Sequence, residues 1–225
     1  VLDKLETLPG AFHFRVICGA TGSGKSRLLG ALETCGAQVL DLEGLAQHRG
    51  SVLGDLPHLA QPSQKWFDTS LVQALQNLDH ALPVYVEAES NKIGRLLLPT
   101  ALNNALHASE CLVLETVPDA RVRLLLEDYQ HFVDEPETLI KQLQVLHQFH
   151  GGRQIENWNE LIRAGKFGTL VSELLELHYD PSYLRSLGKH YTRLEQAHNI
   201  VLSDLSTGAL MDVAKSLLEN RFGNP

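Results

Sequence analysis

The chain has 225 residues, of which 44% are hydrophobic and 20% charged, and its formal net charge is −8 at pH 7. This length is near the upper end for one hydrophobic core. The negative charge argues against a broadly basic surface for nucleic acid, but it leaves room for a local one. No apolar run approaches the roughly 20 residues that cross a bilayer, so we expect a cytoplasmic protein without a membrane partner.

A glycine-rich motif follows the first apolar run. Residues 12–18 are apolar, residues 19–26 have the pattern G-x-x-x-x-G-K-S, and residues 27–33 favour a helix. Glycines let backbone N–H groups curl around a phosphate, and the following helix presents its positive end to the same anion. Lys25 is expected to reach the outer phosphates and Ser26 to bind Mg²⁺. The predicted phosphate-binding residues are Gly19, Thr21, Gly22, Ser23, Gly24, Lys25 and Ser26.

Five short apolar runs predict a sheet, at residues 12–18, 37–41, 84–88, 111–115 and 199–202. Continuous apolar runs are typical of strands buried on both faces, so we expect an α/β fold of the P-loop NTPase type, with a mostly parallel five-stranded sheet flanked by helices. Between the second and third runs, leucines and Phe67 recur at helical spacing, at positions 67, 71, 75, 78 and 82.

Residues 119–198 have the pattern of consecutive helices. A capping signal at Asp134 with Glu137 predicts one that stops at residues 151–152, and others are expected near residues 156–164 and 169–178 and after a cap at Asp180. Ser206 or Thr207 is expected to cap a last helix, which ends at Asn220. The predicted division is a core of residues 1–118 and 199–225 and a helical insertion of residues 119–198, the place where P-loop enzymes often hold an acceptor or a lid.

Acidic residues end two of the predicted strands. Glu87 and Glu89 have same-face spacing at the end of the third run, and Asp41 and Glu43 lie at the end of the second. A magnesium ion on Ser26 usually needs such a carboxylate. Glu87 is the first candidate for the metal-linked or water-positioning role, and Asp41 remains open as the alternative.

Polar loops follow the same strands, at the edge where open α/β sheets bind ligands. Arg49 beside His48 supplies donors for a phosphate or diphosphate, and residues 61–65 and 90–95 place further polar groups at this edge. The predicted catalytic set is Lys25, Glu87, Arg49 and Asp41. The predicted substrate-binding set is Glu43, His48, Arg49, Ser51, Gln64, Lys65, Glu89 and Ser90.

The combination of these motifs resembles tRNA 2-selenouridine synthase over nearly the whole chain. It comprises residues 19–26, 41–46, 48–51, 61–65, 86–90, 93–94, 121–125 and 179–181. Generic nucleotide kinases share residues 19–26 of this set. They do not share the motifs at residues 41–46 with 48–51, at 61–65, or at 86–90 with 93–94.

The resemblance implies the P-loop domain of a transferase that replaces the sulfur of wobble 2-thiouridine in tRNA with selenium from selenophosphate, through an S-geranylated intermediate made from geranyl diphosphate. It also implies an N-terminal rhodanese-like domain, which these residues do not include, and a supplier of selenophosphate. Gly22, Gly24, Lys25 and Ser26 would hold the diphosphate of the prenyl donor or a phosphate of selenophosphate.

Two other function classes share parts of the pattern. A small-molecule or nucleotide kinase would use the same loop with Mg-ATP and a helical lid with Arg121 and Arg123. A non-catalytic module would bind a nucleotide and turn nothing over. Binding of geranyl diphosphate against binding of ATP separates these classes from the transferase.

Overall fold

The computed structural model describes residues 1–57, 59–191 and 196–219. Its central sheet has five strands in the order β2-β3-β1-β6-β7, and every neighbouring pair is parallel. The strands are β1 (Phe14–Gly19), β2 (Gln38–Leu40), β3 (Val84–Glu87), β6 (Glu110–Thr116) and β7 (His198–Leu202). The predicted α/β class and all five strands are confirmed. The two-stranded antiparallel hairpin of β4 (Lys92–Ile93) and β5 (Leu96–Leu97) was not predicted.

The sheet is parallel because its central strands have no solvent face. In β1, all residues except Arg15 are buried, and all four residues of β3 are buried. Val16 is paired with Val86 on one side and Cys111 on the other. Strands buried in this way need helices on both faces of the sheet. These helices form the crossover connections between parallel strands.

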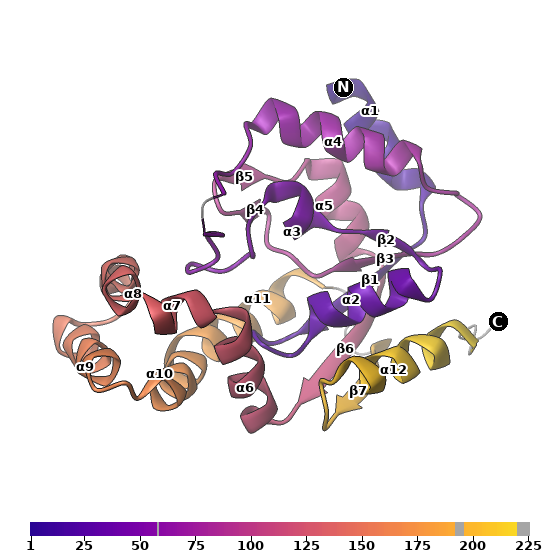
Figure 1. The fold of residues 1–225 in the computed structure, drawn as a ribbon. Helices are drawn as coiled ribbons and strands as arrows, with labels where there is room; N and C mark the ends of the chain where they lie inside the picture. Colours follow the sequence, from indigo (N-terminus) through magenta and orange to yellow (C-terminus); the bar gives the residue numbers. More distant parts are fainter. Residues whose placement is uncertain (58, 192–195, 220–225) are drawn as a thin grey trace.

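Helices cover both faces of the sheet (Figure 1). One core cluster joins it to α1 (Leu2–Thr7), α3 (Leu42–Ala46), α4 (Gln64–Gln76) and α5 (Thr100–His107), with the 3-10 turn η1 (Leu8–Ala11) after α1. The other joins it to α2 (Lys25–Thr34), α6 (Pro118–Asp128) and α12 (Thr207–Glu219). In the described ranges, no helix is both long enough and apolar enough to span a bilayer.

The segment between β6 and β7 is helical where the structure describes it. After α6 come α7 (Gln130–Asp134), α8 (Pro136–Leu143), η2 (Gln144–Gln148), α9 (Gly152–Arg163), α10 (Phe167–Leu174), the π-helical turn η3 (Leu175–Tyr179) and α11 (Asp180–His190). Figure 1 shows α7 to α10 gathered at one side of the sheet, around a core of their own that includes the fully buried Trp158. Ala120 and Leu124 of α6 pack instead with the sheet, and the division at residue 118 stays a prediction.

Several predicted helix ends differ from the structure. Helix α4 ends at Gln76, so Leu78 and Leu82 lie beyond it, and Leu82 is exposed. The N-cap of α8 is Glu135 rather than Asp134, because Asp134 still belongs to α7 and accepts from Gln130. Helices α9 and α10 begin before residues 156 and 169. Ser206 accepts from the Ala209 N–H, which confirms it as a cap of α12; the predicted end at Asn220 lies outside the described residues.

Asp180 does not begin a new helix. α10, η3 and α11 follow one another without a break, and Asp180 has ordinary helical angles. Pro181 has no N–H to donate to the preceding turn of the helix. The wide π turn lies directly before Asp180 and Pro181, and such a turn accommodates the missing hydrogen bond. The Asp180 carboxylate is therefore free for a distant partner.

That partner is Arg121 of α6, which is only 8% exposed. Its Nη1 and Nη2 donate to the two Asp180 carboxylate oxygens at 3.0 and 2.6 Å, and its Nε donates to the Thr21 carbonyl at 2.9 Å. One guanidinium thus joins the glycine-rich loop to the residue that follows the π-helical turn. A bidentate pair of this kind fixes orientation as well as distance.

Asp180→Asn should destabilise the chain by about 2 kcal/mol, because one charge-assisted bond to the buried guanidinium is lost. Urea unfolding followed by circular dichroism measures the change. Glu156→Gln is the matched control, since it makes the same chemical change in the exposed Arg163–Glu156 pair, which should contribute little. Equal effects of the two substitutions would contradict the role given to Arg121.

Candidate functional site

The glycine-rich loop connects β1 to α2, as the motif predicts. Gly22 and Gly24 have φ angles of +77° and +91°, in the left-handed region that side chains disfavour. A Cβ on Gly19 would lie 2.3 Å from Ser23 Oγ, so the tight curl also requires glycine there. The loop therefore has the backbone that its sequence pattern demands.

Two polar side chains of the loop, Ser23 and Lys25, line the same cavity. Lys25 Nζ donates to the Gly19 carbonyl at 2.9 Å and contacts the Ala20 carbonyl at 3.5 Å. Ser23 is 1% exposed, and its hydroxyl has no hydrogen-bond partner among the described residues. An unpaired buried hydroxyl beside a helix N-terminus suits an anion site, because an anion could accept its hydrogen bond.

A cavity of about 450 Å³ opens above the loop and is called the phosphate cavity below. The carboxyl ends of β1 and β3, α3 and the segment after it, α6 and η3 all contribute to its wall. Besides the loop, the lining residues that matter below are Glu43, Arg49, Ser51, Glu87, Glu89 and Ser90. The structure thus brings these six predicted residues together with the phosphate loop.

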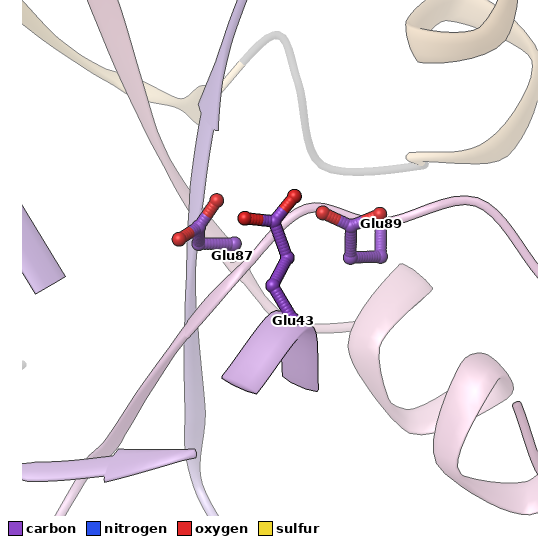
Figure 2. A group of neighbouring side chains, drawn as sticks. All are labelled: Glu43, Glu87 and Glu89. Atoms are coloured by element: carbon purple, nitrogen blue, oxygen red, sulfur yellow. The ribbon is translucent and has the colours of Figure 1, made fainter. Parts of the chain in front are cut away.

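Three of them form an acidic cluster. Glu43 comes from α3, Glu87 ends β3 and Glu89 follows it, and their carboxylates lie within 4.8 Å of one another. Figure 2 shows the three groups side by side, with Glu43 in the middle of the view. The Gly50 N–H donates to Glu43, and a Cβ on Gly50 would lie 2.3 Å from a Glu89 oxygen, so the cluster needs glycine there.

Burial and mutual repulsion disfavour three negative charges in this space. Burial, followed by the charge of Glu43, raises the pKa of Glu87 to about 7, against the opposing effects of Lys25 and Ser26. The pKa of Glu89 is also raised well above its usual value, first by burial and then by the charge of Glu43. Burial also raises the pKa of Glu43, although the Gly50 N–H and Lys25 oppose it. The three carboxyl groups therefore either keep protons or need a bound cation to offset their negative charges.

The donor set fits magnesium. Carboxylate and hydroxyl oxygens are the ligands of hard divalent cations, and Ser26, next to Lys25 in the loop, lines the same cavity as Glu87 and lowers the pKa of that carboxyl. Three carboxylates beside an anion site would repel a phosphate unless a cation lay between them. Glu43, Glu87, Glu89 and Ser26 are thus the residues that would hold the ion.

Arg49 is fixed at the cavity wall. Its guanidinium lies over the Tyr129 ring at 4.7 Å from the centroid, and its Nη1 donates to the Asp128 carbonyl. The Ser51 and Tyr129 hydroxyl oxygens are 3.4 Å apart. Stacking on an aromatic face holds the planar guanidinium in place while other donors stay free for an anion.

Four predicted residues have other surroundings. Asp41 is the N-cap of α3, where it accepts from the Gly44 N–H. His48 is paired with Asp55 at 3.5 Å and lines a separate polar cavity. Gln64 bonds the backbone of Leu97, and Lys65 is exposed on α4. These four do not line the phosphate cavity, and their assignment as site residues stays a prediction.

An apolar recess of about 70 Å³ adjoins the phosphate cavity, and the sequence pattern did not locate it. Five residues line both spaces: Thr21, Ser51, Leu125, Tyr129 and Tyr179. Its remaining lining is apolar and comes from α6, α7, α8, α10, η3 and Leu53. Leucines at helical spacing signal only a buried face, so which of them border a cavity is decided by packing.

Glu87→Gln should stabilise the metal-free chain increasingly as the pH rises. A pKa of about 7 in place of the usual 4.5 means that the folded chain holds this proton more tightly than the unfolded chain. The buried charge therefore costs stability as the pH rises from about 4.5 to 7, up to about 3 kcal/mol. Thermal unfolding in chelator at pH 5 and pH 8 measures the difference, and equal shifts at both values would contradict it.

Proteins of a known family resemble this chain in sequence. Residues 12–151 match the family model described as tRNA 2-selenouridine synthase AAA domain. The tRNA 2-selenouridine synthase of Shewanella oneidensis is 30% identical over 243 residues, covering 93% of this chain and 63% of that protein. That of Marinobacter nauticus is 38% identical over 131 residues, covering 57% and 34%. This chain thus spans less than two-thirds of either relative.

Among solved structures, a shikimate kinase from Acinetobacter baumannii aligns over 99% of this chain and 100% of its own, with a TM-score of 0.40 and 15% identity. So distant a likeness says nothing about function. The family match covers more than half of the chain and confirms the resemblance drawn from the motifs. The chain belongs to the tRNA 2-selenouridine synthase AAA domain family.

Proposed function

We propose that this chain is the part of a tRNA-modifying transferase that binds a prenyl diphosphate. The whole enzyme would convert wobble 2-thiouridine to 2-selenouridine through S-geranyl-2-thiouridine. The glycine-rich loop would hold the diphosphate of geranyl diphosphate and, in the selenium step, the phosphate of selenophosphate. We place the reaction in the cytoplasm, with tRNA as the acceptor.

One observation carries the proposal: the phosphate cavity and the apolar recess share a wall. An anion site joined to an apolar space suits a ligand with a charged head and a hydrocarbon tail. The recess has room for the end of a geranyl chain, and the rest would lie along Leu125, Tyr129 and Tyr179 in the larger cavity. Each CH₂ removed from water contributes about 0.8 kcal/mol. ATP has no apolar tail for such a recess.

The residues around the loop suit departure of a diphosphate. In prenyl transfer, the bond between the prenyl carbon and the diphosphate oxygen breaks as the thiocarbonyl sulfur bonds that carbon, and the ring N–H proton of the thiouridine is released to water. Negative charge grows on the leaving diphosphate. Lys25, Arg49 and the backbone N–H groups at the start of α2 would stabilise this charge. Lys25 must exchange its bonds to the Gly19 and Ala20 carbonyls for the phosphate.

Magnesium would be held by Ser26 and the acidic cluster. When bound, it would supply a positive charge against the diphosphate oxygens. Glu87 would then be ionised, because a cation offsets the repulsion from Glu43. Asp41 would act only through the start of α3, which carries Glu43.

The selenium step would require the rest of the enzyme. The rhodanese-like domain implied by the motif resemblance and a supplier of selenophosphate would be its partners. Turnover assays with S-geranylated RNA and selenophosphate measure the share of the reaction that this chain performs alone.

Lys25→Ala should weaken binding of geranyl diphosphate at least tenfold, because the only loop side chain with a positive charge is removed. Isothermal titration with the donor, and separately with Mg-ATP, measures it. Lys141→Ala, an exposed lysine of α8, is the control and should change nothing. Tight ATP binding with no response to geranyl diphosphate would instead favour a kinase or a nucleotide-gated module.

Val171→Phe should fill part of the apolar recess. We expect about tenfold weaker binding of geranyl diphosphate, equivalent to about two CH₂ groups excluded from the recess. Inorganic diphosphate, which has no tail, should bind as before. If both ligands lose affinity equally, the recess does not receive the prenyl chain.

A further inference from the structure

An exposed aromatic ring stands at the edge of the phosphate cavity. Phe149 lies between η2 and α9, is 60% exposed and lines the cavity. Single exposed apolar residues are common and need no explanation. A phenyl ring that borders a cavity with a phosphate loop at its floor is different, because an acceptor that approaches a donor held in the loop would meet it.

The segment that carries Phe149 is held by buried neighbours. The Phe149 ring is 5.3 Å from the His178 ring, and His178 Nδ1 lies 3.1 Å from Nε2 of His150, the residue after Phe149. The His150 ring in turn meets the fully buried Trp158 edge-on, with centroids 5.0 Å apart. The position of Phe149 is therefore fixed before any ligand arrives, which lowers the entropy cost of binding.

A cation is bonded to the wall of the same cavity. Arg185 of α11 is exposed and donates to Ser182 Oγ at 3.2 Å, and Ser182 lines the same cavity. Its charge also acts on His178, which contacts Phe149. In a chain of net charge −8, an arginine bonded to the wall of the cavity that Phe149 also lines supplies a local positive charge.

We propose that Phe149 is a stacking platform for an unpaired nucleobase of RNA, with Arg185 at the neighbouring phosphate. Proteins recognise single-stranded RNA largely by stacking its splayed bases on aromatic rings beside cations. A base on Phe149 would enter the cavity from its mouth while the diphosphate occupies the loop. The proposal rests on the proposed function, since it gives the RNA acceptor its place relative to the donor.

Fluorescence anisotropy with a labelled RNA hairpin, whose loop contains 2-thiouridine, tests the platform at fixed salt. Phe149→Ala should weaken binding about tenfold, and Phe149→Trp should retain it. Trp66→Ala is the matched control, because Trp66 is an exposed aromatic of α4 that lines neither cavity. Arg185→Gln should weaken binding and reduce the salt dependence by about one phosphate contact.

Binding of geranyl diphosphate by Phe149→Ala separates this inference from the proposed function. Unchanged donor binding with weakened RNA binding supports the platform. RNA binding that is equal in Phe149→Ala and the unsubstituted chain, absent in both, or equally lost in Trp66→Ala would overturn it. If RNA binding depends on Phe149 but no variant binds the donor, the platform stands and the donor assignment fails.

Discussion

The arrangement of the site depends on one buried guanidinium. Arg121 bonds the Thr21 carbonyl of the glycine-rich loop and both carboxylate oxygens of Asp180, 59 residues further along the chain. Through it, the loop that belongs to the sheet and the π-helical turn of the helical segment keep one relative position. The residues beside Asp180, His178 and Tyr179, line the phosphate cavity for this reason. A lysine could not make the same three directed bonds.

The second constraint is electrostatic. The glycine-rich loop is built for an anion, yet three carboxylates lie next to it within 4.8 Å of one another. Each feature is unfavourable alone. The ionised carboxylates are disfavoured, as their raised pKa values show, and they would repel a phosphate in the loop. A divalent cation would resolve both problems at once, so binding of the proposed donor and binding of the metal should be linked in this chain.

Much of the fold followed from local pattern. The loop, the five strands and the parallel sheet were predicted, because apolar runs and glycine spacing report directly on buried strands and tight turns. Helix ends were predicted less well. Asp134 and Asp180 both looked like caps, but Asp134 ends α7 and Asp180 is paired with Arg121 in mid-helix. A capping residue and an ion-pair partner have the same side chain, and only its neighbours in space distinguish them.

The sequence by itself determined the chemistry: a phosphate loop of glycines, Lys25 and Ser26, with acids and Arg49 placed after the strands that end beside it. Strand ends in a parallel sheet converge, so this grouping is a consequence of order along the chain. Only the tertiary structure decided that Glu43 joins Glu87 and Glu89 while His48 and Lys65 do not line the cavity. It also decided which leucines border the apolar recess. The pattern of neighbouring residues predicts local backbone structure, but it does not predict which distant helices pack together.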